Sequence, residues 1–252
     1  MPRLMRTIIP RIKKSIERRG VIASLFRGFL LPVQLLNEHR KAKELARDKT
    51  RSEFDRAYGV ETDGDIGGVT YISDLDIPST NWIYAYNYGA IAVEAFRQSV
   101  SDLDIDFTRF TFIDFGSGKG RALLLASQLP FKKIVGIEFS PELCAIAQKN
   151  LHKFPKSAQR CESIETLSMD FTEYSFPPEP SVLFFNRPSW AKPLARVVEN
   201  LRESLRLSAR DVYIVFVAPV YEEIEAVFDS AEFLVRIERH RGDFTFNIYK
   251  TI

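Results

Sequence analysis

The sequence predicts an α/β fold in which seven strands form one mostly parallel sheet, closed by a C-terminal antiparallel hairpin and preceded by an N-terminal helical extension. From residue 111 onward, short apolar strand patterns alternate with amphipathic helix patterns, which is typical of a parallel sheet. Residues 233–239 and 244–249 then alternate in polarity around a Gly-Asp turn, which predicts the hairpin. Residues 1–36 have apolar positions at helical spacing among many basic residues.

Length and composition indicate one large α/β domain with an appendage. The chain has 252 residues, of which 45% are hydrophobic and 27% charged, ordinary values for a globular protein in water. Neither Cys144 nor Cys161 belongs to a C-x-x-C pair, so a reducing compartment fits best and we expect a cytoplasmic location. The three histidines are scattered without ligand spacing, so no metal site is predicted.

The N-terminal extension has the opposite charge to the rest of the chain. Residues 1–50 contain 13 Lys or Arg and 4 Asp or Glu, whereas the remainder contains 22 and 29. The apolar run at residues 21–36 is interrupted by Arg27 and Pro32 and is shorter than the ~20 residues of a membrane-spanning helix. Residues 1–36 are either helices that cover the active site or a peripheral membrane anchor, and nucleic acid is a less favoured partner. The opposite charges of arm and body favour the first interpretation.

The chain divides into three parts: a basic helical extension (1–50), a helical and loop-rich cap (51–110), and a cofactor-binding domain (111–252). In the cap, residues 90–100 are predicted to form a helix. Strands are predicted at residues 111–115, 133–139, 163–168, 181–185 and 212–218. The helices between them are predicted at residues 121–129, 140–151 and 194–205. Ser140 and Pro141 are typical of the N-cap and first position of a helix.

A glycine-rich turn follows the first strand and indicates a cofactor site. Residues 114–120 read Asp-Phe-Gly-Ser-Gly-Lys-Gly, and Glu138 ends the next strand, 22 positions after Gly116. Such a unit holds an adenosine-containing cofactor, with the acid accepting hydrogen bonds from the ribose. The spacing fits neither the dinucleotide motif nor the phosphate-binding lysine loop. Because Asp114 disfavours a phosphate and suits a cation, the cofactor indicated is S-adenosylmethionine.

Residues 112–151 resemble the cofactor motif and following acidic strand of class I S-adenosylmethionine-dependent methyltransferases. Residues 54–59, the glycine loop and residues 136–143 also resemble a group of uncharacterised bacterial methyltransferases, whose loop is similar to that of Dot1-like lysine methyltransferases. This resemblance covers residues 51–252 and implies a Rossmann-like seven-stranded methyltransferase sheet. It does not identify the methyl acceptor.

The resemblance also implies roles for individual residues of the cofactor site. Glu138 would hold the ribose hydroxyls, and Phe139 would pack on the adenine. Asp170 would accept a hydrogen bond from the adenine amine, beside Phe171 as a pocket wall; the alternative for Asp170 is a solvated loop acid. The methionine part would be held by the glycine loop through Asp114, Phe115, Gly116, Ser117, Gly118 and Gly120.

Two residues are candidates for the catalytic step. Asn186 follows the fourth strand, where many amino-group methyltransferases have Asp/Asn-Pro-Pro-Tyr/Phe; here the sequence is Asn-Arg-Pro-Ser, and Trp190 could supply the aromatic ring. The alternative is that Asn186 caps the following helix. Tyr88 matches a tyrosine of the related bacterial proteins, although their Pro-Thr-Pro-like segment is replaced here by Gly-Ala-Ile.

Three functions remain open on the sequence. The first is a methyltransferase that acts on an amine, with N-methylation favoured over O- or C-methylation. The second is a catalytically inactive cofactor-binding module that docks on membrane or nucleic acid through its basic arm. The third is an enzyme that uses another adenosine cofactor, such as NAD.

Overall fold

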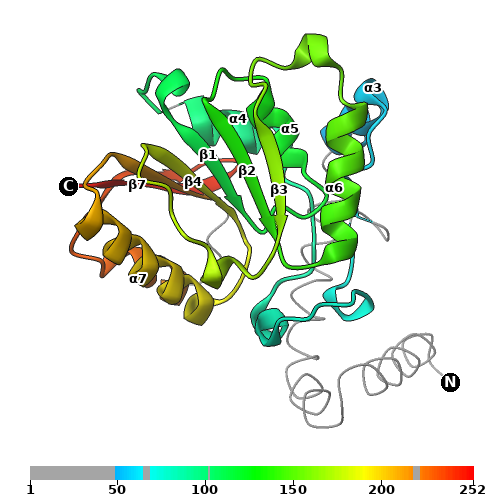
Figure 1. The fold of residues 1–252 in the computed structure, drawn as a ribbon. Coiled ribbons are helices and arrows are strands. Elements are labelled where there is room, and N and C mark those ends of the chain that lie inside the picture. The colour runs from blue at the N-terminus through cyan, green and yellow to red at the C-terminus, as the bar shows by residue number, and fades with distance from the viewer. Residues whose placement is uncertain (1–48, 65–68, 102, 218–221) are drawn as a thin grey trace, which may run out of the picture.

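The protein is described by a computed structural model that covers residues 49–64, 69–101, 103–217 and 222–252 (Figure 1). The predictions for residues 1–36, and for nearly all of the 1–50 extension, lie outside these described residues. Within them, no helix is both long enough and apolar enough to span a membrane.

Seven strands form one sheet, as the sequence predicted. The strand order is β3-β2-β1-β4-β5-β7-β6; β1 to β5 pair in parallel, and β7 runs antiparallel to both β5 and β6. The strands are β1 (Thr111–Phe115), β2 (Lys133–Glu138), β3 (Ile164–Ser168), β4 (Ser181–Asn186), β5 (Val212–Val217), β6 (Leu234–Arg241) and β7 (Thr245–Thr251). The order reverses between β1 and β4, which places a ligand site at the carboxyl ends of these two strands. The Rossmann-like methyltransferase fold class is therefore confirmed.

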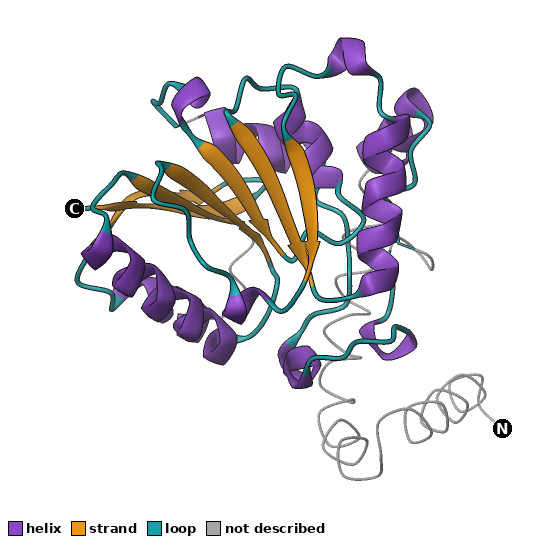
Figure 2. Ribbon diagram, viewed as in Figure 1, coloured by secondary structure: helices purple, strands orange, loops and turns teal. Residues whose placement is uncertain are grey.

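Helices cover both faces of the sheet (Figure 2). One face packs against α3 (Lys49–Tyr58), α4 (Val93–Ser101), α5 (Arg121–Ser127) and α6 (Pro141–Lys153). The other face packs against α7 (Ala191–Leu207) and α8 (Glu222–Asp229). Strands such as β1 and β5 are buried on both faces, so their sequences are continuous apolar runs rather than alternating ones.

Two helices differ from the sequence prediction. Helix α4 begins at Val93 rather than at residue 90, because the chain up to that point crosses the top of the sheet in an extended form. Helix α8 has no counterpart among the helices placed from the sequence; it is a short element of eight residues with only Ile224 and Phe228 buried.

Candidate active site

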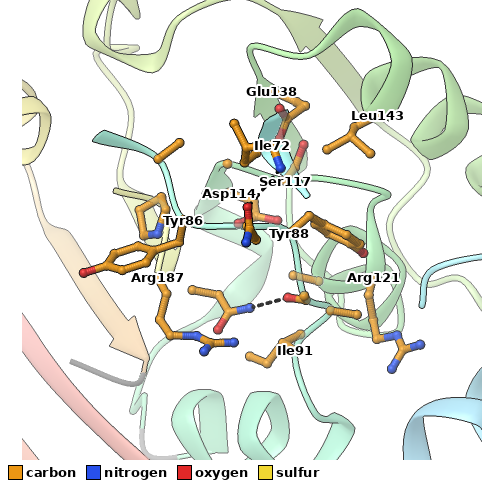
Figure 3. A pocket seen from close by; sticks show the side chains of 18 of the residues that line it. Ile72, Tyr86, Tyr88, Ile91, Asp114, Ser117, Arg121, Glu138, Leu143 and Arg187 are labelled. Atoms are coloured by element: carbon orange, nitrogen blue, oxygen red, sulfur yellow. Dashed lines mark hydrogen bonds between the residues drawn. The ribbon is translucent and has the colours of Figure 1, made fainter. Parts of the chain in front are cut away.

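A pocket opens at the carboxyl ends of β1, β2 and β4. It encloses about 740 Å³ of space not filled by protein atoms, with the open solvent at its mouth included. Eight of the predicted site residues line it together, drawn from five segments of the chain (Figure 3). They are Tyr88, Asp114, Gly116, Ser117, Glu138, Phe139, Phe171 and Asn186.

The glycine loop turns sharply between β1 and α5. Gly116, Gly118 and Gly120 have φ angles of 86°, 54° and 88°, a left-handed region that a side chain disfavours. A Cβ on Gly116 would approach the Cβ of Pro188 to 3.1 Å, and one on Gly118 would enter the ring of Tyr88. Each glycine is thus required both by its backbone angle and by the side chain that packs against it.

Two carboxyl groups are buried in the pocket. Asp114 and Glu138 are 2% and 4% exposed. Burial, and then the charge of Glu138, raises the pKa of Asp114 to about 8. Burial also raises the pKa of Glu138 to about 7, although its oxygens accept hydrogen bonds from the backbone N–H of Gly118 at 2.8 Å and of Ser140 at 2.9 Å. The raised pKa values mean that these two buried acids resist ionisation when the pocket holds no positive charge. A cationic ligand would lower both pKa values and favour the ionised acids, so the pocket suits a cation.

Residues 85–91, which we call the strap, form one wall of the pocket. Tyr88 exchanges backbone hydrogen bonds with Thr70 on one side, and Ala85 forms a bridge with Ser189 on the other. The Tyr88 hydroxyl donates to the carbonyl oxygen of Thr62 at 2.5 Å. The strap therefore connects the segment before it in the chain to the loop that follows β4.

A buried arginine fastens residues 55–63 to the end of the glycine loop. Arg121, the first residue of α5, is 1% exposed; its Nε donates to the Thr62 hydroxyl at 2.5 Å, and its guanidinium pairs with Asp55 at 3.1 Å and Asp63 at 2.9 Å. Asn150 of α6 exchanges two hydrogen bonds of 2.9 Å with the backbone of Glu61. Thr62 therefore links Arg121 to Tyr88, a connection that the sequence pattern does not reveal.

Four predicted cofactor residues lie outside the pocket lining. Phe115 is fully buried in the sheet and stacks on Phe185 with 4.7 Å between ring centroids. Gly118 lies behind the Tyr88 ring, and Gly120 caps α5.

Asp170 is the fourth predicted cofactor residue outside the pocket lining, and its carboxylate is hydrogen-bonded to other parts of the chain. Its carboxylate accepts from the Ser79 hydroxyl, from Asn81 at 2.9 Å, and from the backbone and hydroxyl of Thr172 at 2.9 and 2.7 Å. Although burial acts against this, these hydrogen bonds hold the pKa of Asp170 below its usual value. Asp170 thus joins the turn after β3 to residues 79–81 and does not line the pocket. Its predicted hydrogen bond with the adenine amine stays a prediction.

Asn186 ends β4 and reaches into the pocket. Its amide nitrogen lies 3.5 Å from the carbonyl oxygen of Gly89 in the strap. The following helix, α7, begins only at Ala191, and the residue at its N-cap is Trp190, so the helix-cap alternative for Asn186 is wrong. Trp190 stacks on Tyr86 at 6.1 Å and does not line the pocket.

Several lining residues have no site prediction from the sequence. Tyr86, Ile91, Leu143 and Arg187 all contribute to the pocket wall (Figure 3). Arg187 was noticeable only as a departure from a motif. Tyr84, Tyr86 and Tyr88 recur at two-residue spacing in the sequence, but the placement of Tyr86 and Tyr88 in the pocket wall depends on the path of the strap.

A family model for the histone methylation protein DOT1 matches residues 81–226, more than half of the chain. The chain belongs to the DOT1 family. The matched region includes the strap, the glycine loop, Glu138 and Asn186, which all contribute to the pocket or its walls. A search of curated proteins with this chain finds no match.

Solved methyltransferase structures are similar at low identity. A ribosomal protein L11 methylase from Lactobacillus delbrueckii subsp. bulgaricus has a TM-score of 0.46 at 14% identity, over 63% of this chain and 77% of that one. A putative RNA methyltransferase from Pyrococcus horikoshii has 0.46 at 17%, over 71% and 93%. An RNA methyltransferase from Salinibacter ruber in complex with S-adenosyl-L-homocysteine has 0.41 at 19%, over 63% and 90%. Because all three TM-scores lie below 0.5, these similarities do not support a conclusion about the substrate or activity of this chain.

As a DOT1-family protein, the chain is an S-adenosylmethionine-dependent methyltransferase, and NAD is set aside as the cofactor. The pocket fits this cofactor, because its two buried carboxyls suit a ligand with positive charge and a diol. When bound, S-adenosylmethionine supplies an electrophilic methyl group.

Proposed function

We propose that this chain transfers the methyl group of S-adenosylmethionine to an amine. The observation that carries the proposal is the position of Asn186, which ends β4, lines the pocket and caps no helix. An amide oxygen at this place can accept a hydrogen bond from an amine N–H and aim the nitrogen lone pair at the methyl carbon. Orientation of this kind is a large part of what an enzyme contributes to a displacement reaction.

The reaction needs no general base among the protein's residues. A neutral amine attacks through its own lone pair, and the carbon–sulfur bond breaks with its electrons staying on the sulfur. The new ammonium then loses its proton to water. Asp114 and Glu138 stabilise positive charge in the pocket before transfer, and the strap excludes water from one side.

Labelled methyl transfer tests the proposal. The full chain is incubated with S-adenosylmethionine carrying a labelled methyl group and with fractions of cell extract separated into protein, lipid, RNA and small molecules. A labelled product that mass spectrometry identifies as an N-methyl amine supports the proposal, whereas an O- or C-methyl product, or release of the label as methanol in mild alkali, contradicts it. Cofactor binding by titration without any transfer would support the catalytically inactive module instead.

Contacts of residues 1–36 with a membrane stay a prediction, which vesicle binding of the full chain would test.

A further inference from the structure

Lys119 is a buried lysine in the middle of the glycine loop. It is 1% exposed and stands between Gly118 and Gly120, directly before helix α5. Two local effects disfavour a cation in this place, because lysine is rarely buried without partners and the N-terminus of a helix carries partial positive charge. Residues that break local rules in this way are expected at functional sites, where other contacts compensate.

The ammonium group of Lys119 contacts two segments that come earlier in the chain. Its Nζ donates a hydrogen bond to the carbonyl oxygen of Asp63 at 2.9 Å. The same nitrogen lies 5.9 Å from the centroid of the Tyr88 ring, a distance at which the negative face of an aromatic ring attracts a cation. This attraction is stronger where water is excluded, as it is around this buried side chain. Lys119 therefore attracts the Tyr88 ring to the glycine loop.

The backbone of Lys119 is bonded to the same neighbourhood. Its carbonyl oxygen accepts a hydrogen bond of 2.9 Å from the side-chain amide of Asn150, and the same amide nitrogen donates to the carbonyl oxygen of Glu61 at 2.9 Å. The backbone and the ammonium group of Lys119 are thus both connected to residues 61–63. These contacts fix the place of the ammonium group relative to the glycine loop.

Tyr88 lines the pocket, whereas Lys119 does not. The Tyr88 ring occupies the space beside Gly118, and its hydroxyl donates to the carbonyl oxygen of Thr62. A hydrogen bond at the hydroxyl alone fixes only the tip of this side chain. Lys119 adds a contact on the ring itself, and a side chain contacted at both places is restricted to one position.

We propose that Lys119 is a positioning residue for cofactor binding. It acts through Tyr88, whose ring it holds against the glycine loop as a preformed wall of the S-adenosylmethionine site. A wall that is in place before binding saves the cost of ordering it when the cofactor arrives. The inference concerns the cofactor alone, so it goes beyond the proposed amine methylation and does not depend on which atom of the acceptor receives the methyl group.

A double-mutant cycle in cofactor affinity tests the inference. The full chain is titrated calorimetrically with S-adenosylhomocysteine, so that the measurement does not need turnover. Lys119→Met keeps the apolar stem and removes the ammonium group, and we expect it to weaken binding at least about fivefold. With Tyr88→Leu already in place, the same change should alter the affinity by less than about twofold, because the ring that Lys119 holds is then absent.

Fluorine NMR of the full chain labelled with fluorotyrosine reports on the Tyr88 ring directly. The Tyr88 signal is assigned by its disappearance in Tyr88→Phe. It should shift or broaden in Lys119→Met and stay near its parent position in Lys119→Arg, which keeps the cation. Cofactor affinity should follow this signal, so it should fall in Lys119→Met and stay within about twofold of the parent value in Lys119→Arg.

Lys192→Met is the matched control, since the Lys192 Nζ also lies near a tyrosine ring, 5.4 Å from the centroid of Tyr84, but is exposed and outside the pocket lining. It should change neither the Tyr88 signal nor the affinity. Unchanged affinity in Lys119→Met, equal losses in the two Tyr88 backgrounds, or a Tyr88 signal that moves without a loss of affinity would overturn the inference. If Lys119→Met does not fold, Lys119→Arg still decides, because a parent-like Tyr88 signal combined with weakened binding contradicts it.

Discussion

The ring of Tyr88 lies against Gly118, in the space that a Cβ at that position would occupy. Residues 30 positions apart in the chain thus pack together at the wall of the pocket. Two hydrogen bonds stabilise this contact: the Tyr88 hydroxyl donates to the carbonyl oxygen of Thr62, and Nε of Arg121 donates to the Thr62 hydroxyl. The position of the glycine loop therefore depends on residues 55–63 as well as on β1 and α5.

Gly118→Ala should weaken S-adenosylmethionine binding and destabilise the fold. The left-handed φ costs an alanine about 1–2 kcal/mol, and the Tyr88 ring must also move. Gly59→Ala is the matched control, because Gly59 has a φ of 65° but no atom within 4 Å of its Cβ position. Urea unfolding and cofactor titration should show a larger loss for Gly118→Ala, part of which the added change Tyr88→Ala restores. Equal effects of the two glycine variants would contradict the packing argument.

Arg121→Met should destabilise the protein by about 3–5 kcal/mol, because it leaves Asp55 and Asp63 without their buried partner. Arg202→Met removes an arginine of the exposed pair with Glu199, where 46% of the arginine side chain is accessible, and should change the stability far less, because solvent screens an exposed pair. Denaturant unfolding of both variants measures the difference. Similar small losses would show that the network around Thr62 is not needed for the fold.

Cofactor affinity should rise with pH between about 6 and 9. The pKa values of Glu138 and Asp114, about 7 and about 8, mean that both acids ionise in this window, and the ionised acids attract the cationic sulfonium. Asp114→Asn should remove much of the rise, as measured by titration at several pH values. Both proteins bind the same cofactor, so the ratio of their affinities does not depend on the ionisation of the cofactor itself. A parallel pH profile in both proteins would contradict a charge role for Asp114.

The same acids affect the stability of the cofactor-free protein in the opposite direction. Because the folded pKa of Asp114 lies above the unfolded value of 3.8, protonation favours the fold. That contribution is complete below about pH 4 and is lost as pH rises toward 8. The unfolding free energy of Asp114→Asn should therefore exceed that of the parent chain at pH 8–9, and the gap should close as the solution is acidified. Denaturant unfolding across this pH range measures the difference in unfolding free energy between the two proteins. A difference that stays constant with pH would argue against the raised pKa of Asp114.

Asn186→Ala should lower turnover by about 2–4 kcal/mol in activation free energy, as expected for a group that positions the reacting nitrogen. Cofactor affinity should change little, since the acids and the glycine loop are untouched. Asn200→Ala serves as control, because Asn200 lies outside the pocket and donates to the Thr172 carbonyl. Single-turnover rates on an accepted substrate measure the effect. Full activity in Asn186→Ala would exclude the positioning role.

The sequence was informative wherever local pattern determines structure. Strand and helix alternation predicted the sheet, and the glycine spacing with Glu138 predicted where the pocket lies. It did not reveal partners that come from distant segments. The contacts of the Asp170 carboxylate with Ser79 and Asn81 are one example. The link from Arg121 through Thr62 to Tyr88 joins three segments whose proximity no local periodicity encodes.

The strap is held by a handful of hydrogen bonds, and its principal backbone pairings are two isolated bridges. Such a segment can open at far less cost than the sheet beneath it. Since the strap forms one wall of the pocket, its opening would widen the route by which the spent cofactor leaves. Where product release limits turnover, a looser strap would then raise the number of catalytic cycles per second without any change in the methyl-transfer step.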